Sequence, residues 1–199
     1  MPQHMIVGAD RQVSIEVAAW DGVGAAADLS CACMFSREAD GQPVRGGLAH
    51  LDGALGGALL KLRREGHFRA ASGETLLIDR PPQAIASRAL LIVGLGDPEN
   101  WSAAVLAEAV RSALGMAMVL GVRSAAFAPS MLDSGITPDR TQGAPAQMIR
   151  GLRAALAAAE RLDQLGLKPS PTLERWVFDV GAARFDSAAE QFRLALQQG

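Results

Sequence analysis

Ala89-Leu-Leu-Ile-Val-Gly-Leu-Gly96 is the stretch of sequence that decides the fold of this chain. Residues 90–93 are apolar on both faces, as they are in a parallel strand that helices cover on each side. Runs of apolar residues predict further strands at 13–19, 28–36, 74–79, 123–128 and 173–180. Spacings of three and four residues predict helices at 48–65, 102–120 and 145–165, and a last helix from about 185. Strands and helices in this order predict an α/β fold, a three-layer α/β/α sandwich with a mixed, largely parallel sheet.

The composition is that of one globular domain, which we place over residues 1–199. Apolar residues make up 49% of the chain and charged residues 20%, which is enough apolar surface to bury a core. The formal net charge of −2 provides no positive field for neutralising phosphates, so nucleic acid is not an expected partner. Residues 1–10 lack the pattern of a signal peptide and no run of 18 apolar residues occurs, which predicts a cytoplasmic protein without a membrane span.

Two cysteines, Cys31 and Cys33, lie two positions apart in a predicted strand. Side chains at this spacing point to the same face of a strand and do not readily close a disulfide. The spacing also differs from the Cys-x-x-Cys of redox and zinc motifs. We expect both cysteines to be small hydrophobic residues of the core.

A pair of glycines, Gly56 and Gly57, falls inside the predicted helix 48–65. Each glycine in a helix costs on the order of 1 kcal/mol relative to alanine. We expect the pair to allow a close approach of this helix to the sheet.

Gly94-Leu-Gly96 stands between a strand and a helix, where dinucleotide-binding folds place a glycine-rich turn. Here Glu99 occupies the third glycine position, and Asp97 adds a carboxylate where a pyrophosphate would have to lie. We therefore interpret these glycines as a structural turn and expect no nicotinamide or flavin cofactor.

The segment 129–143 is the candidate binding site. It is the least regular stretch of the chain and follows a predicted strand, and open α/β sheets bind ligands beyond the ends of their strands. It offers hydroxyl groups, glycine amides and one cation to a phosphate or another anion. The candidate ligand-binding residues are Ser130, Ser134, Gly135, Thr137, Arg140, Thr141 and Gly143. The alternative is a long connector without a ligand.

No spacing in the sequence identifies catalytic or metal-binding residues. The three histidines, His4, His50 and His67, are scattered and form no metal-type pair. Neither a Gly-x-Ser-x-Gly elbow nor a cysteine–histidine arrangement is present. We therefore predict no catalytic residues and no metal.

Four segments, taken in order, resemble the amino-terminal, macro-like domain of the leucyl aminopeptidase family. They are Leu51-Asp-Gly-Ala-Leu-Gly-Gly-Ala-Leu59, Gly66-His-Phe-Arg69, Gly73-Glu-Thr-Leu-Leu77 and Ala89-Leu-Leu-Ile-Val-Gly-Leu-Gly96. In that family a helix with a small-residue pair precedes a Gly-Asp-Phe turn, a Gly-Glu strand and a strand ending in Gly-Leu-Gly. The resemblance runs over about 14–127, and the last strand and helix also fit the macro-domain pattern.

The resemblance implies two different functions. The family's two-metal chemistry resides in a separate carboxyl-terminal domain, and none of its motifs is present, so a non-catalytic binding or assembly domain is the first expectation. Its partners would be further copies of the chain or an aminopeptidase catalytic partner. The alternative is a macro-type binder or hydrolase of ADP-ribose or a related nucleotide. Macro domains use an asparagine-rich strand end for that ligand, and Cys31-Ala-Cys-Met-Phe-Ser36 lacks the asparagines.

Overall fold

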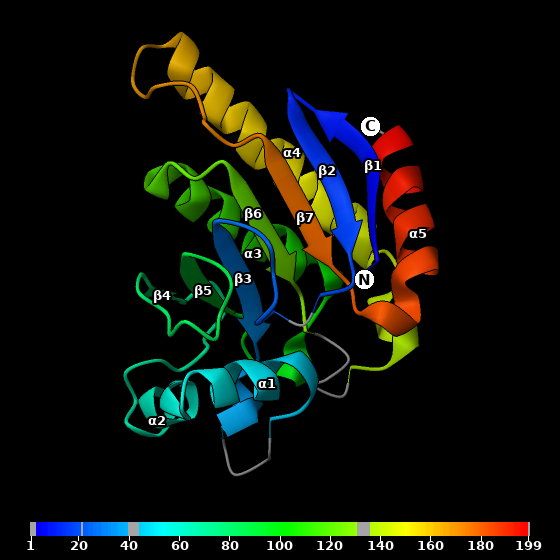
Figure 1. The fold of residues 1–199 in the computed structure, drawn as a ribbon. Helices are drawn as coiled ribbons and strands as arrows, with labels where there is room; N and C mark the ends of the chain where they lie inside the picture. The colour runs from blue at the N-terminus through cyan, green and yellow to red at the C-terminus, as the bar shows by residue number, and fades with distance from the viewer. Residues whose placement is uncertain (1–2, 21, 40–43, 131–135, 199) are drawn as a thin grey trace.

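The fold is built on one seven-stranded sheet, shown in a computed structural model that describes residues 3–20, 22–39, 44–130 and 136–198. The strands are β1 (His4–Asp10), β2 (Val13–Ala18), β3 (Leu29–Met34), β4 (Thr75–Ile78), β5 (Ala89–Gly94), β6 (Ser124–Ala128) and β7 (Arg175–Asp179). Their order in the sheet is β1-β2-β7-β6-β3-β5-β4 (Figure 1). The five inner strands are parallel, and the edge strands β1 and β4 are antiparallel to their neighbours. The predicted α/β fold with a mixed, largely parallel sheet is confirmed.

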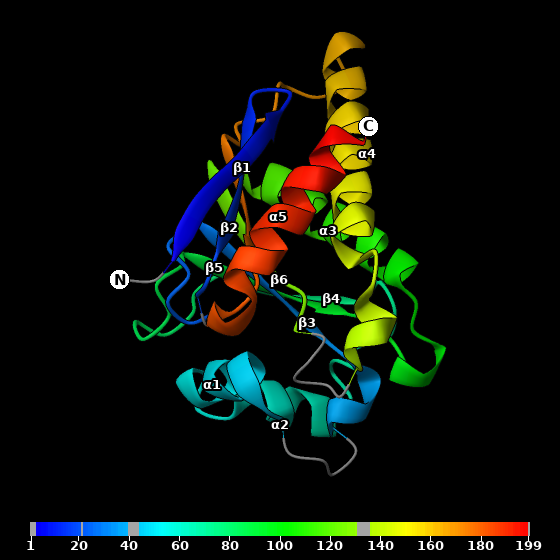
Figure 2. The same cartoon turned by 90° about the vertical axis from the view of Figure 1, so that its right-hand side faces the viewer.

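Helices cover the sheet on both faces. They are α1 (Gly46–Ala54), α2 (Ala58–Arg64), α3 (Ala103–Leu120), α4 (Ala144–Gln164) and α5 (Phe185–Gln197). Short 3-10 turns precede several of them: η1 (Ser36–Ala39), η2 (Pro98–Asn100), η3 (Pro138–Thr141) and η4 (Ala182–Arg184). Figure 2 shows α3, α4 and α5 on one side of the sheet and α1 and α2 on the other.

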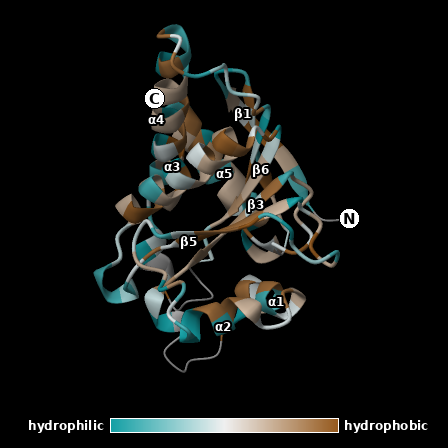
Figure 3. Cartoon of the chain, turned by 90° about the vertical axis from the view of Figure 1, so that its left-hand side faces the viewer, coloured by the Kyte–Doolittle hydropathy of each residue, from teal (hydrophilic) through white to brown (hydrophobic). Residues whose placement is uncertain are grey.

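The central strands contribute side chains to both layers, which explains why their sequences are apolar without alternation. On β5, Leu91 and Val93 pack in the core beneath α3, α4 and α5, whereas Leu90 and Ile92 pack beneath α1 and α2. Figure 3 shows the hydrophobic colouring of the sheet between the two layers of helices. Both faces of the predicted central strand are therefore covered.

The two cysteines occupy the core position that their spacing predicts. Cys31 and Cys33 are fully buried, are not joined in a disulfide, and lie on the β3 face beneath α3, α4 and α5. Burial raises the pKa of the Cys31 thiol, because a thiolate would lose its hydration there.

The predicted helix at 48–65 is interrupted in the structure, and the expected reason for its glycines is wrong. Gly56 and Gly57 have φ angles of 64° and 80° and separate α1 from α2. A Cβ at either position would meet no heavy atom within 4 Å, so no close approach to the sheet requires them. The left-handed backbone of this break is what glycine supplies.

A close helix contact lies instead between α3 and α4. A Cβ added at Gly151 would lie 2.3 Å from the carbonyl oxygen of Ala107, so the backbones of the two helices touch here. At this position α3 and α4 therefore pack with no side chain between their backbones. α3 is also the described helix that is long and apolar enough to fit a membrane span, yet seven of its residues are buried against its neighbours within the fold.

The sequence analysis missed the first strand, β1. Only Val7 is buried in this edge strand, and Ile6 is 64% exposed, so the alternation that reveals a half-covered strand is weak. β1 pairs with β2 through a hairpin at Arg11 and Gln12, both of which have positive φ. The sheet therefore begins at His4 rather than at Val13.

Candidate functional site

The chain reverses its direction across the sheet between β3 and β6. From β3 it continues through α1 and α2 on one face toward β5, and from β6 it continues through α4 on the other face toward β7. Open α/β sheets bind ligands in the crevice that such a divergence leaves at the carboxyl ends of the strands. The topology alone thus points to the end of the sheet where β3, β6 and β7 finish.

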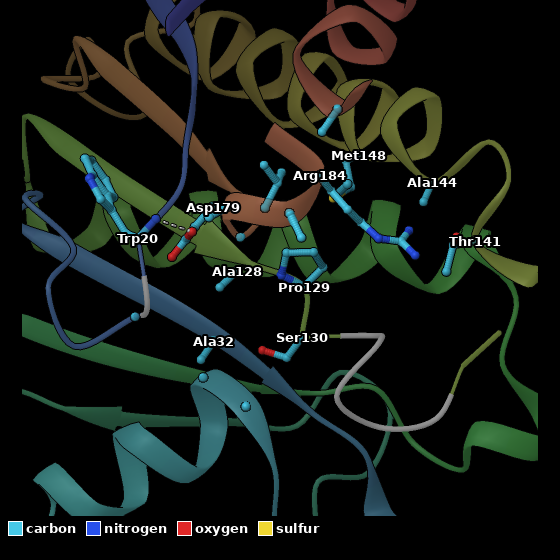
Figure 4. A pocket seen from close by; sticks show the side chains of 18 of the residues that line it. Trp20, Ala32, Ala128, Pro129, Ser130, Thr141, Ala144, Met148, Asp179 and Arg184 are labelled. Carbon is cyan, nitrogen blue, oxygen red and sulfur yellow. Dashed lines mark hydrogen bonds between the residues drawn. The ribbon is translucent and has the colours of Figure 1, made fainter. Parts of the chain in front are cut away.

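A pocket of about 460 Å³ opens at this place (Figure 4). Its walls come from the ends of β3, β6 and β7, from the first turns of α1, α4 and α5, and from the segment after β2. Much of the lining is apolar, including Ala32, Pro129 and Met148. The volume and the apolar lining are those of small-molecule sites in proteins.

Three helices begin at the pocket, and none has a side-chain cap. The N-cap residues are Arg45, Gly143 and Arg184. None of them has a side chain that accepts a hydrogen bond from a backbone N–H of the first turn. The first turns of α1 and α4 carry no acidic residue, and that of α5 carries the exposed Asp186. The positive ends of three helix dipoles therefore face one cavity.

Arg184 is a cation in the wall of the pocket that the sequence analysis did not identify. The chain leaves β7 through Gly181, whose φ of 73° and ψ of 150° are accessible essentially to glycine alone. The following turn, η4, places Arg184 at the pocket, and Figure 4 shows its half-buried side chain extending toward Thr141. Within the described part of the chain its guanidinium makes no hydrogen bond or ion pair.

Asp179 closes the inner side of the same pocket. This last residue of β7 is 6% exposed, and its Oδ1 accepts a hydrogen bond of 2.9 Å from the backbone N–H of Trp20. Figure 4 shows Asp179 beside Trp20, away from the guanidinium of Arg184. The bond ties the end of β7 to the segment that follows β2.

The structure brings two of the predicted site residues to the pocket. Ser130 and Thr141 line it. Ser130 has a φ of 49°, a left-handed conformation that costs a residue other than glycine on the order of 1 kcal/mol and often marks functional segments. Gly143 is the N-cap of α4 and Thr137 is exposed, and neither lines the pocket. Ser134 and Gly135 lie outside the described residues.

Arg140, the cation expected in the candidate site, lies outside the pocket lining. Its Nη2 donates hydrogen bonds to the carbonyl oxygens of Pro98 at 3.2 Å and Trp101 at 3.1 Å. The side chain thereby fastens the start of α4 to the segment before α3. No sequence pattern distinguished this anchoring role from a ligand contact.

The glycine turn at Gly94 and Gly96 serves packing. A Cβ at Gly94 would lie 2.2 Å from the carbonyl oxygen of Ala71, and Gly96 has a φ of 73°. The Asp97 carboxylate caps η2 by accepting a 2.9 Å hydrogen bond from the N–H of Glu99. The pocket lies elsewhere, at the ends of β3, β6 and β7.

The described residues contain no group of three or more histidine, cysteine or acidic side chains that could hold a metal ion. The pocket's own histidine, His50, is exposed and makes no hydrogen bond within the described residues. The polar groups at the site are thus suited to holding a ligand by hydrogen bonds and charge.

Comparison with solved structures places the fold among two groups of proteins. A mutant of tomato leucine aminopeptidase matches 92% of this chain at 18% identity with a TM-score of 0.71, and the chain spans 35% of that protein. A macrodomain of Oceanobacillus iheyensis solved with ADP matches over the whole chain and 97% of its own length, at 17% identity and a TM-score of 0.67. A Trypanosoma brucei macrodomain in complex with ADP gives a TM-score of 0.62 at 18% identity, over 93% of this chain and 69% of that one.

Sequence comparison gives the family. A probable cytosol aminopeptidase of Acidobacterium capsulatum is 38% identical over 77 residues, which are 39% of this chain and 15% of that protein. The model of the N-terminal domain of the cytosol aminopeptidase family matches residues 34–162, more than half of the chain. This chain therefore belongs to the cytosol aminopeptidase family, with its match in that family's N-terminal domain.

Proposed function

We propose that this domain is a non-catalytic binding module that holds a small, phosphate-bearing molecule of the nucleotide type in the pocket at the ends of β3, β6 and β7. The observation that carries the proposal is the convergence of three helix N-termini and Arg184 on one cavity of about 460 Å³. Helix N-termini and guanidinium groups both favour phosphate. The two macrodomains solved with ADP share the fold, which supports a ligand of this class.

We propose binding without chemistry because the described lining of the pocket lacks the parts of a catalyst. Hydrolysis of a phosphate ester or glycosidic bond needs a positioned base or a metal-bound water. The described lining offers one exposed histidine and one carboxyl group, Asp179, which already accepts a hydrogen bond from the main chain. We accordingly expect neither peptidase activity on leucyl substrates nor turnover of the bound nucleotide.

The proposal is tested by thermal unfolding with ADP, ADP-ribose, adenosine and inorganic phosphate. A ligand at a hundred times its Kd adds about 2.7 kcal/mol to the free energy of unfolding. In a domain of this size that raises Tm by about 5–10 °C. Two variants make the test specific to the pocket. Ala183→Trp fills the pocket mouth and should abolish the shift, whereas Ala154→Trp, on an exposed position of α4, should keep it. An unchanged Tm with every compound would refute the proposal.

Assembly is the second function, favoured by exposed apolar residues at the end of the molecule away from the pocket. Val119 at the end of α3 and Leu167 after α4 are each 69% exposed. We propose that a further copy of the chain or an aminopeptidase catalytic partner covers them in the cytoplasm. Sedimentation velocity tests self-association: the wild type should sediment as a multiple of 20.8 kDa. The double variant Val119→Glu with Leu167→Glu should sediment as a monomer. A monomeric wild type would refute self-association and leave the aminopeptidase catalytic partner as the protein that covers these residues. Adding the catalytic domain of a family member to the chain and repeating the sedimentation tests that partner.

A further inference from the structure

We propose that Arg184 anchors the ligand's phosphate and that Asp179 forces the ligand to bind in one orientation, with its anionic group away from the end of β7. This inference rests on the proposed function and names the residues of the same pocket that attract and repel the ligand's charged group. Neither residue belongs to the irregular segment 129–143 that the sequence marks as the site. Both come from the end of β7 and the turn that follows it.

Arg184 is available to a ligand because no described residue pairs with its charge. The other half-buried arginines of the described chain are engaged: for example, Arg153 pairs with Asp10 at 3.0 Å, and Arg175 lies 3.8 Å from Glu16. The guanidinium of Arg184 has no such partner among the described residues, although its side chain is half-buried in the pocket wall. A partly desolvated cation without a counter-ion is stabilised by an anion that enters the cavity.

The placement of Arg184 is set by the backbone rather than by side-chain contacts. Gly181 turns the chain out of β7, and η4 then brings Arg184 to the N-cap position of α5. Ser187, the third residue of α5, donates a hydrogen bond of 3.1 Å to the carbonyl oxygen of Arg184 and also lines the pocket. The main chain that carries the guanidinium is therefore held from both sides, while the side chain extends across the cavity toward Thr141 (Figure 4).

Asp179 gives the pocket its polarity. Its carboxyl group is nearly buried at the inner side of the cavity, where low exposure strengthens the repulsion of any anion. The groups that face it include the N–H of Trp20, to which it is bonded, and the apolar Ala32 and Ala128 of the pocket wall. A ligand with one anionic end therefore lies with that end at Arg184 and its neutral end near β7.

Isothermal titration of ADP and adenosine into three proteins tests the assignment. In Arg184→Gln the affinity for ADP should fall on the order of ten- to a hundredfold, and the affinity for adenosine should stay within about twofold. The matched control is Arg161→Gln, which removes an exposed guanidinium in the last turn of α4, outside the pocket lining, and should change neither affinity more than about twofold. The salt dependence of ADP binding should weaken in Arg184→Gln alone. Unliganded Tm values show that each variant is folded.

Two further outcomes separate this inference from the function on which it rests. If the wild type binds ADP and Arg184→Gln binds it equally well, the anchoring role is refuted while the binding function stands. If the wild type binds neither ADP nor adenosine, both are refuted together. Asp179→Asn reports the orientation: the amide oxygen can still accept the Trp20 hydrogen bond, and loss of the negative charge should raise the affinity for inorganic phosphate. If Asp179→Asn leaves the phosphate affinity unchanged or lowers it, Asp179 does not repel the anionic end of the ligand.

Discussion

Replacing Gly151 by alanine should destabilise the protein although alanine is the better helix former. The added Cβ would lie 2.3 Å from the carbonyl oxygen and 2.8 Å from the Cα of Ala107, both part of the backbone of α3. An ordinary carbon–oxygen contact is about 3.3–3.6 Å, so α3 and α4 must separate by roughly 1 Å. Overpacking of this kind costs about 1–3 kcal/mol, and the helix propensity of alanine offsets at most about 1 kcal/mol.

Gly115→Ala is the matched control for this substitution. Gly115 also lies inside a long helix, α3, but a Cβ there would meet no heavy atom within 4 Å. We expect Gly115→Ala to raise Tm by about 2–4 °C and Gly151→Ala to lower it by about 2–8 °C, measured by circular dichroism. If the two variants shift Tm in the same direction, the backbones of α3 and α4 do not touch at Gly151 and Ala107.

Three other predictions follow from the core and the turns. Burial raises the pKa of the Cys31 thiol and shields both cysteines. An aromatic disulfide reagent should therefore modify no cysteine in the native protein and two per chain in guanidinium chloride. Rapid modification of the native protein would contradict the burial of β3. Burial opposes ionisation of Asp28, but hydrogen bonds from Ser124 and from the N–H of Arg123 outweigh it and lower the pKa of the carboxyl group. The ionised carboxylate therefore stabilises the folded protein above about pH 4, and this stabilisation is lost as the pH falls through the pKa of the folded state. In urea titrations, Asp28→Asn should therefore reduce the free energy of unfolding by about 1–3 kcal/mol at pH 7 and by much less near pH 3. An equal reduction at the two pH values would show that the negative charge of Asp28 is not what stabilises the fold. Gly181→Ala should introduce backbone strain of about 1–3 kcal/mol, which lowers Tm by about 2–12 °C, and it should also weaken ADP binding. An unchanged Tm would place Gly181 in an ordinary conformation.

The sequence predicts the layers of this fold because its central strands carry a strong signal. Residues 90–93 are apolar at every position, and the structure uses alternate side chains for the two helix layers. The same logic fails at β1, where a single buried residue, Val7, leaves no periodic pattern. It fails again at Gly56 and Gly57, because periodicity alone does not separate one helix from two helices joined by a left-handed turn.

The candidate site was predictable in its location and less so in its residues. A long segment after a strand end pointed to Ser130 and Thr141, which do line the pocket. Arg140 and Arg184 look alike in the sequence, and only the fold shows that one donates to carbonyl oxygens while the other extends into the cavity. Asp179 escaped notice because the last residue of an apolar strand carries no local sign of facing a pocket.

The binding of a phosphate-bearing ligand at the ends of β3, β6 and β7 is tested most directly by titrating ADP into ¹⁵N-labelled protein and following the amide resonances. We predict saturable shifts confined to the residues around the pocket, with the largest at Ser130, Thr141 and Arg184, and unchanged resonances at the far ends of α3 and α4. A spectrum that ADP leaves unchanged at millimolar concentration, or shifts that gather around Val119 and Leu167 instead, would contradict it.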